Sequence, residues 1–157
     1  MTVFRAALTA LAALELPGLR ANYDLTELPE TLSSAQLPAL LTLPGETPDG
    51  ALSRPLFGNR AAGFEAQAFR GSAATVTLHP WHLLLLAPLG EGLGLRSHLP
   101  RLVDLLDAYL EAIAVDLTLG GRLLEPTQLE VEVGVFPYAS VAYHGCRLRH
   151  TWKLALG

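Results

Sequence analysis

The sequence has little charge. Only 17% of its 157 residues are Asp, Glu, Lys or Arg, against roughly 25% in typical soluble domains, while half of the residues are apolar. Lysine occurs once, at Lys153, and no basic run exists, so a clustered cationic surface for phosphate groups is missing. This argues against nucleic acid as the main partner, and it leaves few charges to cover the surface of a monomer.

Cysteine and long apolar runs are also scarce. Cys146 stands alone, which rules out an internal disulfide and a zinc site built from thiolates. No stretch reaches about 18 consecutive apolar residues, so no transmembrane helix is predicted and no membrane is expected among the partners. The length predicts a single domain, residues 1–157, whose core needs no covalent staples.

The first half of the chain predicts one helix, one buried strand and a long arm. Thr2 is placed to cap a helix of about 13 residues, which Pro17-Gly18 ends. The run LPALLTLPG, residues 37–45, predicts a buried strand bounded by prolines. From about residue 45 to 72, Gly, Pro and polar residues predict a long loop or hairpin arm with a possible strand at 63–70. Its aromatic residues indicate a partner surface: Phe57, Phe64 and Phe69.

The stretch TVTLHPWHLLLLAP, residues 75–88, changes its pattern in the middle. Before His79-Pro80 apolar and polar residues alternate, as in a strand with one wet face, and after Trp81-His82 four leucines follow one another. We interpret the change as a strand that passes from a half-exposed setting into one covered on both faces. The second cover is either the arm or a neighbouring subunit, so Leu84 and Leu86 are candidate interface residues.

A second helix carries the strongest periodic signal. Ser97 is placed to cap it, and Pro100 then falls in the tolerated first turn. Its apolar residues step by three and four: Leu99, Leu102, Val103, Leu106, Leu110, Ile113 and Leu117. Gly120-Gly121 ends the pattern.

Two alternating strands, residues 129–136 and 146–156, close the chain. If they pair antiparallel, opposite charges face one another and support that register: Glu130 and Glu132 against Arg147, Arg149 and Lys153. Helices and strands do not alternate regularly enough for a doubly wound parallel sheet. The sequence therefore predicts an α+β domain, with a mostly antiparallel or mixed β-sheet, two main helices packed on one face, and the arm.

The chemical motifs are weak. His79 and His82 fall on opposite faces of a regular strand, so a shared metal needs a bulge at Pro80, and we favour satisfied polar histidines. The carboxylates of the second helix indicate a solvated face: Asp104, Asp107 and Glu111. No serine lies in a nucleophile elbow, and the turn GEGLG lacks the third glycine and the lysine of nucleotide-binding loops. We therefore predict no catalytic residue, metal or cofactor, and no enzyme.

The order of the elements carries a resemblance. The helix FRAALTALAAL precedes the extended piece ANYDL and the strand LPALLTLP. The arm then leads to TVTLHPWHLLLLAP, the helix LPRLVDLLDAYLEAIA and a final aromatic-bearing strand, YHGCRLRHTWKLAL. In this pattern the chain resembles the tail terminator proteins of long-tailed, siphovirus-type phages, and it is similar to those of lambdoid phages. The Pro80 kink and the length of the arm depart from the family pattern.

The resemblance implies a structural virion protein that forms a hexameric ring. Such a ring caps the phage tail tube, stops its elongation and joins the tail to the head connector. The implied partners are other copies of the chain, the tail tube protein and the connector or neck protein, with DNA only passing through the lumen. The implied location is the virion tail or neck, and the host cytoplasm during assembly. On this interpretation Glu130 and Glu132 face the lumen and repel the passing DNA.

Two other interpretations stay open. The first is a different neck or tail protein, such as a head-completion (stopper) or tail-tube protein, because these share much of the pattern. The second, which the residues favour less, is a small ligand-binding module or enzyme. That second interpretation requires a closed pocket with convergent polar groups and a perturbed titrating residue.

Overall fold

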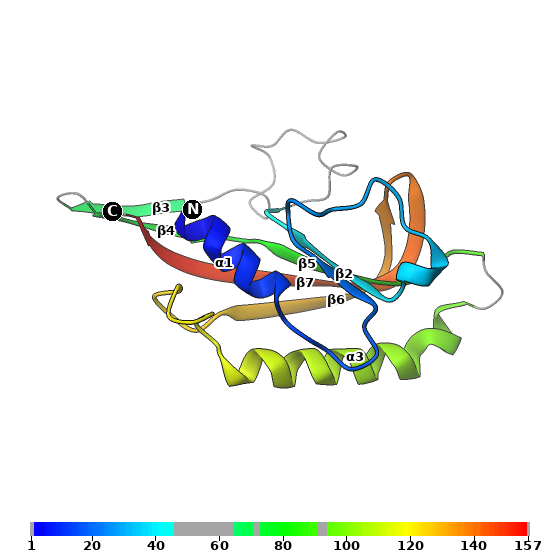
Figure 1. Cartoon of the computed structure of the whole chain (residues 1–157). Coiled ribbons are helices and arrows are strands. Elements are labelled where there is room, and N and C mark those ends of the chain that lie inside the picture. The colour runs from blue at the N-terminus through cyan, green and yellow to red at the C-terminus, as the bar shows by residue number, and fades with distance from the viewer. Residues whose placement is uncertain (1, 46–64, 71–72, 91–93, 157) are drawn as a thin grey trace.

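The computed structural model describes residues 2–45, 65–70, 73–90 and 94–156. The helices are α1 (Val3–Ala12), the short 3-10 turn η1 (Ser34–Gln36) and α3 (Leu95–Val115). The strands are β1 (Ala21–Tyr23), β2 (Ala39–Leu43), β3 (Glu65–Arg70), β4 (Ala73–Leu78), β5 (Trp81–Pro88), β6 (Gln128–Tyr138) and β7 (Val141–Leu156). The described strands form one mixed sheet in the order β1-β2-β5-β7-β4-β3, with β6 also paired to β7 (Figure 1). The predicted α+β fold class is confirmed.

Strand β7 is the spine of the sheet. It pairs antiparallel with β6 along one edge, and with β5 and then β4 along the other. Strands β4 and β5 therefore form one line that is broken at residues 79–80. Within the break the backbone N–H of His150 donates to the carbonyl of Pro80 at 2.9 Å, so this buried donor of β7 stays satisfied beside the kink.

Strand β5 is covered on both faces, as the leucine run predicts. Leu84 and Leu86 point into a core that the sheet shares with both helices, and Leu83 and Leu85 point into a second cluster on the opposite face. Several members of the second cluster come from the connector between β1 and β2 and from the β6–β7 hairpin: Leu28, Leu32, Leu37, Tyr138 and Tyr143. Among the described residues the second cover is therefore the chain's own connector and hairpin. The sequence predicts either the arm or a neighbouring subunit in this place; most of the arm lies outside the described residues, and the burial of Leu83 and Leu85 requires no neighbouring subunit.

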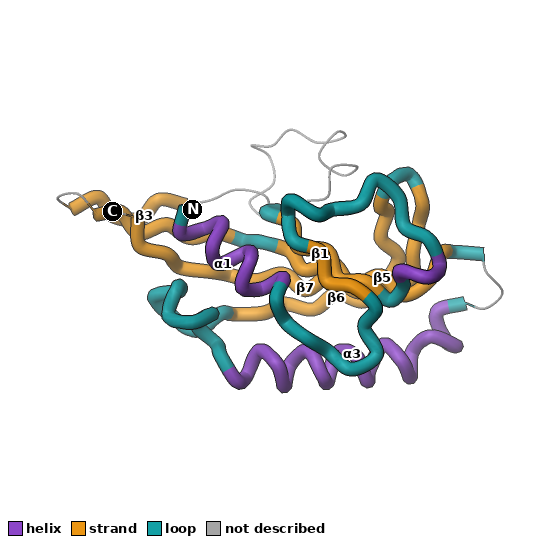
Figure 2. Tube along the Cα trace, in the orientation of Figure 1, coloured by secondary structure: helices purple, strands orange, loops and turns teal. Residues whose placement is uncertain are grey.

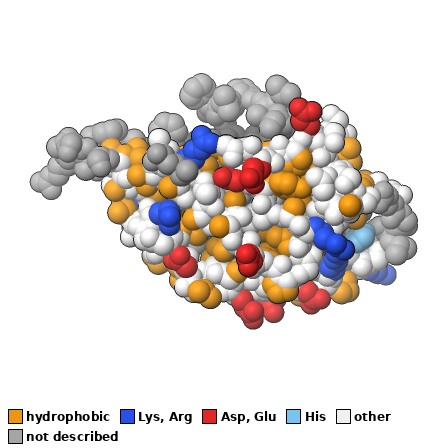
Figure 3. Space-filling model, in the orientation of Figure 1, with side chains coloured by type: hydrophobic (Ala, Val, Ile, Leu, Met, Phe, Trp, Pro, Cys, Tyr) orange, Lys and Arg blue, Asp and Glu red, His pale blue; other side chains and the backbone are white. Residues whose placement is uncertain are grey.

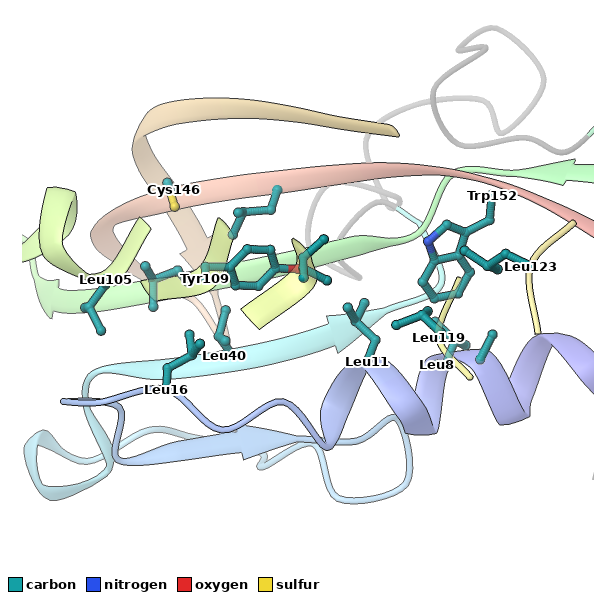
Figure 4. Packing of buried hydrophobic residues seen from close by; sticks show 14 of the residues in the cluster. Leu8, Leu11, Leu16, Leu40, Leu105, Tyr109, Leu119, Leu123, Cys146 and Trp152 are labelled. Carbon is teal, nitrogen blue, oxygen red and sulfur yellow. The ribbon is translucent and has the colours of Figure 1, made fainter. Parts of the chain in front are cut away.

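Both helices pack on the same face of the sheet (Figure 2). Helix α1 buries Ala7, Leu8 and Leu11, and α3 buries Leu102, Leu105, Tyr109 and Ile113. Figure 4 shows how these side chains meet: Leu8 and Leu11 lie toward Trp152 of β7, while the ring of Tyr109 lies between the sheet and the helices. Both helices and β7 thus contribute side chains to one hydrophobic core.

The helix starts were predicted with mixed success. Thr2 caps α1 as predicted, because its Oγ1 accepts a hydrogen bond from the N–H of Arg5 at 3.4 Å. The prediction that Ser97 caps the second helix is wrong, since α3 begins at Leu95 with Gly94 as its N-cap. The hydroxyl of Ser97 instead donates to the carbonyl of Gly94 at 2.8 Å, inside the first turn.

The sheet continues beyond Phe136, where the alternation that predicts strands 129–136 and 146–156 is interrupted. Strands β6 and β7 continue through this region and are joined by the two-residue turn Ala139-Ser140. Both turn residues have positive φ, 51° and 65°, which is the backbone of the two-residue turns that suit twisted hairpins. The sequence gives no Asn-Gly or Asp-Gly signal here, so the hairpin could not be recognised from its turn.

Strands β5 and β7 approach closely at Gly145. A methyl group on Gly145 would lie 1.9 Å from the carbonyl oxygen of Leu84, far inside van der Waals contact. Gly134 is the register partner of Gly145 on β6, and a methyl group there meets nothing within 4 Å. Only the glycine of the spine is therefore required by the close approach of another backbone.

We expect Gly145→Ala to lower the free energy of unfolding by about 3 kcal/mol or more, because the added methyl group forces the two central strands apart. Gly134→Ala is the matched control, and its effect should stay within about 0.5 kcal/mol because the site is open. Urea denaturation followed by circular dichroism measures both variants. Equal stability of the two variants would contradict the close approach.

Candidate functional site

Two of the predicted interface residues lie inside the core. Leu84 is 1% exposed and Leu86 is 3% exposed, and both belong to the cluster shared by α1, α3 and β7. A side chain that its own chain covers has no surface to offer a neighbour, so the assignment of these two leucines to a subunit interface is wrong. Phe57 and Phe64 fall outside the described residues, and Phe69 lies on β3, of which only the backbone is described.

The apolar residues of α3 divide between core and surface. Leu102 and Ile113 of the predicted stripe are buried, and the buried face continues through Leu105 and Tyr109, which the prediction left out. Three residues of the predicted stripe lie on the flank of the helix and are 40%, 59% and 49% exposed: Leu99, Val103 and Leu110. We call these three residues the α3 ridge. The apolar sector of α3 is wider than the face that the sheet covers, so part of it needs another partner.

Strand β6 adds a second exposed apolar row. Val131, Val133 and Val135 are 43%, 43% and 48% exposed. The register partners of the first two are Leu148 and Cys146, which are buried in the helix-side core, so the valines face the same side of the sheet as α3. In the view of Figure 3, hydrophobic side chains lie between acidic ones over the surface of the molecule.

The predicted charge pairing between the last two strands is present for both arginines, whereas Lys153 pairs with Glu125, which precedes β6. Arg149 donates to Glu130 at 3.1 Å, and Arg147 donates to Glu132 and also lies 4.2 Å above the ring of Trp81. Both glutamates thus have a basic partner at the surface, where such pairs add little to stability. Whether Glu130 and Glu132 face a lumen stays a prediction, and the paired arginines weaken any repulsion of DNA by these carboxylates.

A chain of hydrogen bonds between side chains runs through the helix-side core. We call it the Tyr109 relay, and its members are Asn22, His82, Tyr109, His150, Thr127 and Trp152. Asn22 fixes the direction of hydrogen-bond donation along the relay. Its amide N–H groups donate to the carbonyls of Leu14 at 3.0 Å and Leu11 at 3.4 Å, so its amide oxygen remains as the acceptor. Its amide oxygen must then accept the proton of His82 Nε2 at 2.9 Å. His82 Nδ1 is therefore the acceptor for the hydroxyl of Tyr109, also at 2.9 Å.

The other half of the relay follows from the first. Because the hydroxyl of Tyr109 donates to one histidine, it accepts from Nε2–H of His150 at 2.7 Å. Nδ1 of His150 then accepts from the hydroxyl of Thr127 at 2.8 Å, and Thr127 accepts from the indole N–H of Trp152 at 3.1 Å. When both histidines are neutral each donor of the relay has an acceptor, and the hydroxyl of Thr127 has a second, longer one in the carbonyl of Gln128 at 3.4 Å.

Burial keeps the relay uncharged. Desolvation, assisted by the neighbouring His150, holds the pKa of His82 well below its usual range, and desolvation lowers the pKa of His150 to about 3. Desolvation and the nearby Cys146 raise the pKa of Tyr109 well above its usual range. A general acid or base needs a pKa near the working pH and a path to substrate. The shifted pKa values of His82, Tyr109 and His150 all lie away from neutral pH, so we interpret the relay as a structural network.

The remaining histidines form no metal centre in the described part of the chain. His79 Nδ1 lies 3.2 Å from the hydroxyl of Thr151, and His82 is committed to the relay, so the preferred interpretation of satisfied polar histidines is confirmed. His98 and His144 have ring centroids 5.4 Å apart, and each has a buried nitrogen without a partner. Two ligands are fewer than structural zinc requires, and the described residues hold no group of three potential ligands.

The predicted carboxylates and the cysteine show no arrangement for catalysis. Asp104, Asp107 and Glu111 are exposed on α3, as expected for a solvated face. Burial raises the pKa of the Cys146 thiol to about 12, so Cys146 stays a protonated core residue and is no nucleophile at neutral pH. In the described residues no helix is long and apolar enough to cross a membrane.

Comparison with known proteins identifies no family. No family model matches the chain, and no curated protein matches it. The function must therefore be argued from the surfaces and the network described above.

Replacing Tyr109 by phenylalanine should break the relay at its centre. Tyr109→Phe leaves a lone pair on His82 and an N–H on His150 buried without partners, so we expect the free energy of unfolding to fall by about 2–4 kcal/mol. Tyr23→Phe is the control, since the Tyr23 hydroxyl accepts from Gln36 at 2.8 Å near the surface, and about 1 kcal/mol or less is expected there. Chemical denaturation at pH 7 separates the two outcomes, and a smaller loss for Tyr109→Phe than for Tyr23→Phe would contradict the relay.

The two neutral histidines predict a loss of stability in acid. Their pKa values are lowered in the fold, so between about pH 6.5 and the folded values the unfolded chain binds more protons and stability falls as the pH falls. Each histidine contributes a slope of about 1.4 kcal/mol per pH unit in that window. Urea midpoints at pH 7, 6, 5 and 4 measure the slope.

His150→Gln provides the control for this pH dependence. The variant should be less stable than the wild type at pH 7, because the relay is broken, but its pH slope should be about half as steep. A wild-type stability that is unchanged from pH 7 to pH 5 would show that the buried histidines are not neutral in the fold.

Proposed function

We propose that this chain is a structural subunit of a phage virion, which assembles as a homo-oligomeric ring, caps the tail tube, stops its elongation and joins the tail to the head connector. The observation that carries the proposal is the pair of exposed apolar rows on the helix side of the sheet, the α3 ridge and Val131, Val133 and Val135 of β6. Exposed apolar surface on a small protein marks interaction sites.

Assembly explains the composition as well as the surface. Only 17% of the residues are charged, so charge repulsion between copies of the chain opposes their association only weakly. We propose a head-to-tail contact for these rows. Head-to-tail contacts close into a ring when the rotation between copies divides a full turn. The ring is proposed to be a hexamer by its resemblance to tail terminators.

The proposed partners follow from that place in the virion. One face of the ring binds the last ring of the tail tube, and the other binds the connector or neck protein, while DNA passes through the lumen. A geometric role of this kind needs no catalytic group, and the structural nature of the Tyr109 relay agrees with it. Another neck or tail protein, such as a stopper or tube protein, would use the same surfaces and is the nearest alternative.

A ligand-binding module or enzyme has less support in the described residues. Two surface hollows that could hold a small ligand lie among the described residues. The first, of about 440 Å³, lies beside the end of α1 and is lined by residues 12–16 and 19–22. Of its polar side chains, Asn22 is already committed to the relay. The smaller hollow, about 190 Å³, lies beside Thr77, Gln128 and the ion pair of Lys153 with Glu125. Neither hollow contains a histidine or cysteine, so neither offers the usual residues for catalysis near neutral pH.

The size of the protein in solution tests the proposal. We expect light scattering to find a species of about six times 16.8 kDa, or binding of the chain to purified tail tubes that halts their growth. The double variant Val103→Asp/Leu110→Asp should abolish both while its thermal midpoint changes little, because both side chains are about half exposed. Asp104→Asn, on the polar flank of the same helix, is the control and should assemble normally.

A wild-type chain that is monomeric at every concentration and does not bind tail tubes would overturn the proposed function. Assembly that the double variant leaves intact would move the subunit interface away from α3.

A further inference from the structure

Strand β6 has one neighbouring strand, β7, in the part of the chain that the structure describes. Strand β6 pairs with β7 through Gln128–Tyr138 without any register shift, and no other described strand pairs with it. Its opposite edge therefore presents backbone donors and acceptors that the described part of the chain does not use. An open edge of this length is a template for another strand.

The hairpin turn identifies which residues carry the free groups. A two-residue turn joins Tyr138 to Val141, so these two residues form the closing hydrogen-bonded pair of the ladder. Pairs alternate along the ladder, and the N–H and C=O groups of Val131, Val133 and Val135 consequently point away from β7. Pro137 falls in the same outward set, where its missing N–H costs the ladder nothing.

Before Pro137 the edge of β6 lacks the lysines, prolines and bulges that protect exposed edge strands from pairing with other chains. Strand β6 contains no lysine and no bulge, and the charges of Glu130 and Glu132 are balanced by Arg149 and Arg147 on β7. Its valines, about half exposed, repeat at every second residue and offer a flat apolar row for a further strand. These features favour pairing of the β6 edge with a further strand.

The chain also carries a strand that can fill this position. Strand β3 lies at the border of the sheet beyond β4, and no described strand pairs with its outer edge. Together with β4 and the end of β7 it extends past the end of β6, at the left of Figure 1. Strand β1 also lies at a border, but it has only three residues. A second copy of the chain can therefore offer β3 to the open edge of the first.

We propose that the outer edge of β6 is joined by β3 of a neighbouring copy, so that the sheet continues from subunit to subunit. The inference rests on the proposed assembly and adds the contact that makes it. Each copy then uses both of its long open edges, and the valines gain a neighbouring strand. Because the two edges differ, the contact is head-to-tail and repeats around the assembly.

A proline at Val133 tests the contact without breaking the subunit. Val133→Pro removes an outward N–H and leaves the ladder with β7 intact, whereas Val133→Thr keeps the N–H and the shape of the side chain. We expect Val133→Pro to weaken self-association by about tenfold or more, as one lost hydrogen bond at an interface can do, while Val133→Thr assembles. Sedimentation velocity over a range of concentrations measures the association, and thermal denaturation of the monomer confirms the fold of each variant.

Hydrogen exchange of the wild-type protein at low and high concentration identifies the occupant. The proposal expects peptides from both β6 and β3 to gain protection on assembly. Protection of β6 without β3 would overturn β3 as the occupant, and assembly without protection of β6, or unaffected by Val133→Pro, would overturn the edge contact. Both of those results leave the proposed function standing, whereas a wild-type chain that stays monomeric alone and on tail tubes removes the two together.

Discussion

The hydroxyl of Tyr109 is the point at which helices and sheet are held in one arrangement. It lies in the hydrophobic core on α3 and bonds to His82 of β5 and His150 of β7, so that a single oxygen links three elements. Hydrophobic packing alone tolerates small shifts of a helix over a sheet, whereas a buried hydrogen bond does not, because an unpaired group costs about 1–3 kcal/mol. The relay therefore selects one position for α3 among the many that would bury similar area.

The same relay reaches the two ends of the fold. Asn22 joins it to the carbonyl of Leu11 in the last turn of α1 and to that of Leu14 just after the helix, and Thr127 joins it to the segment that leads from α3 into β6. All members of the relay are satisfied when both histidines are neutral. Burial enforces that state by lowering the pKa of each imidazole, so the fold and the protonation of its core depend on one another.

The sequence predicted the elements well where the signal is local. The cap at Thr2, the buried strand after Leu37 and the leucine run of β5 were each visible as a spacing of residues. The relay was not visible, because its members are far apart in sequence and a neutral histidine pair has no characteristic spacing. Tyr109 offered one signal, since it lies at helical spacing from Leu102 and Ile113, but an aromatic residue at such a position predicts core packing alone.

Two errors share a different cause, which is that sequence patterns do not say which apolar residues the fold has room to cover. Leu84 and Leu86 were assigned to an interface because four successive leucines exceed what one sheet face can bury. The connector between β1 and β2, which is polar in composition, supplies the second cover through Leu28 and Leu32. On α3 the apolar stripe is wider than the face that the sheet covers, so the α3 ridge remains exposed.

The strands on the two sides of β7 differ in how much of them the chain covers. On one side β5 is covered on both faces, and beside it the polar groups of the relay are satisfied within the chain. On the other side β6 has an open backbone edge and valines that are about half exposed. In a protein that remains a monomer, such an edge strand is usually protected by lysine, proline or a bulge. Strand β6 has no such protection before Pro137, which is consistent with the proposed contact between its edge and a neighbouring subunit. The α3 ridge lies on the same face of the sheet and would extend that contact beyond the strand.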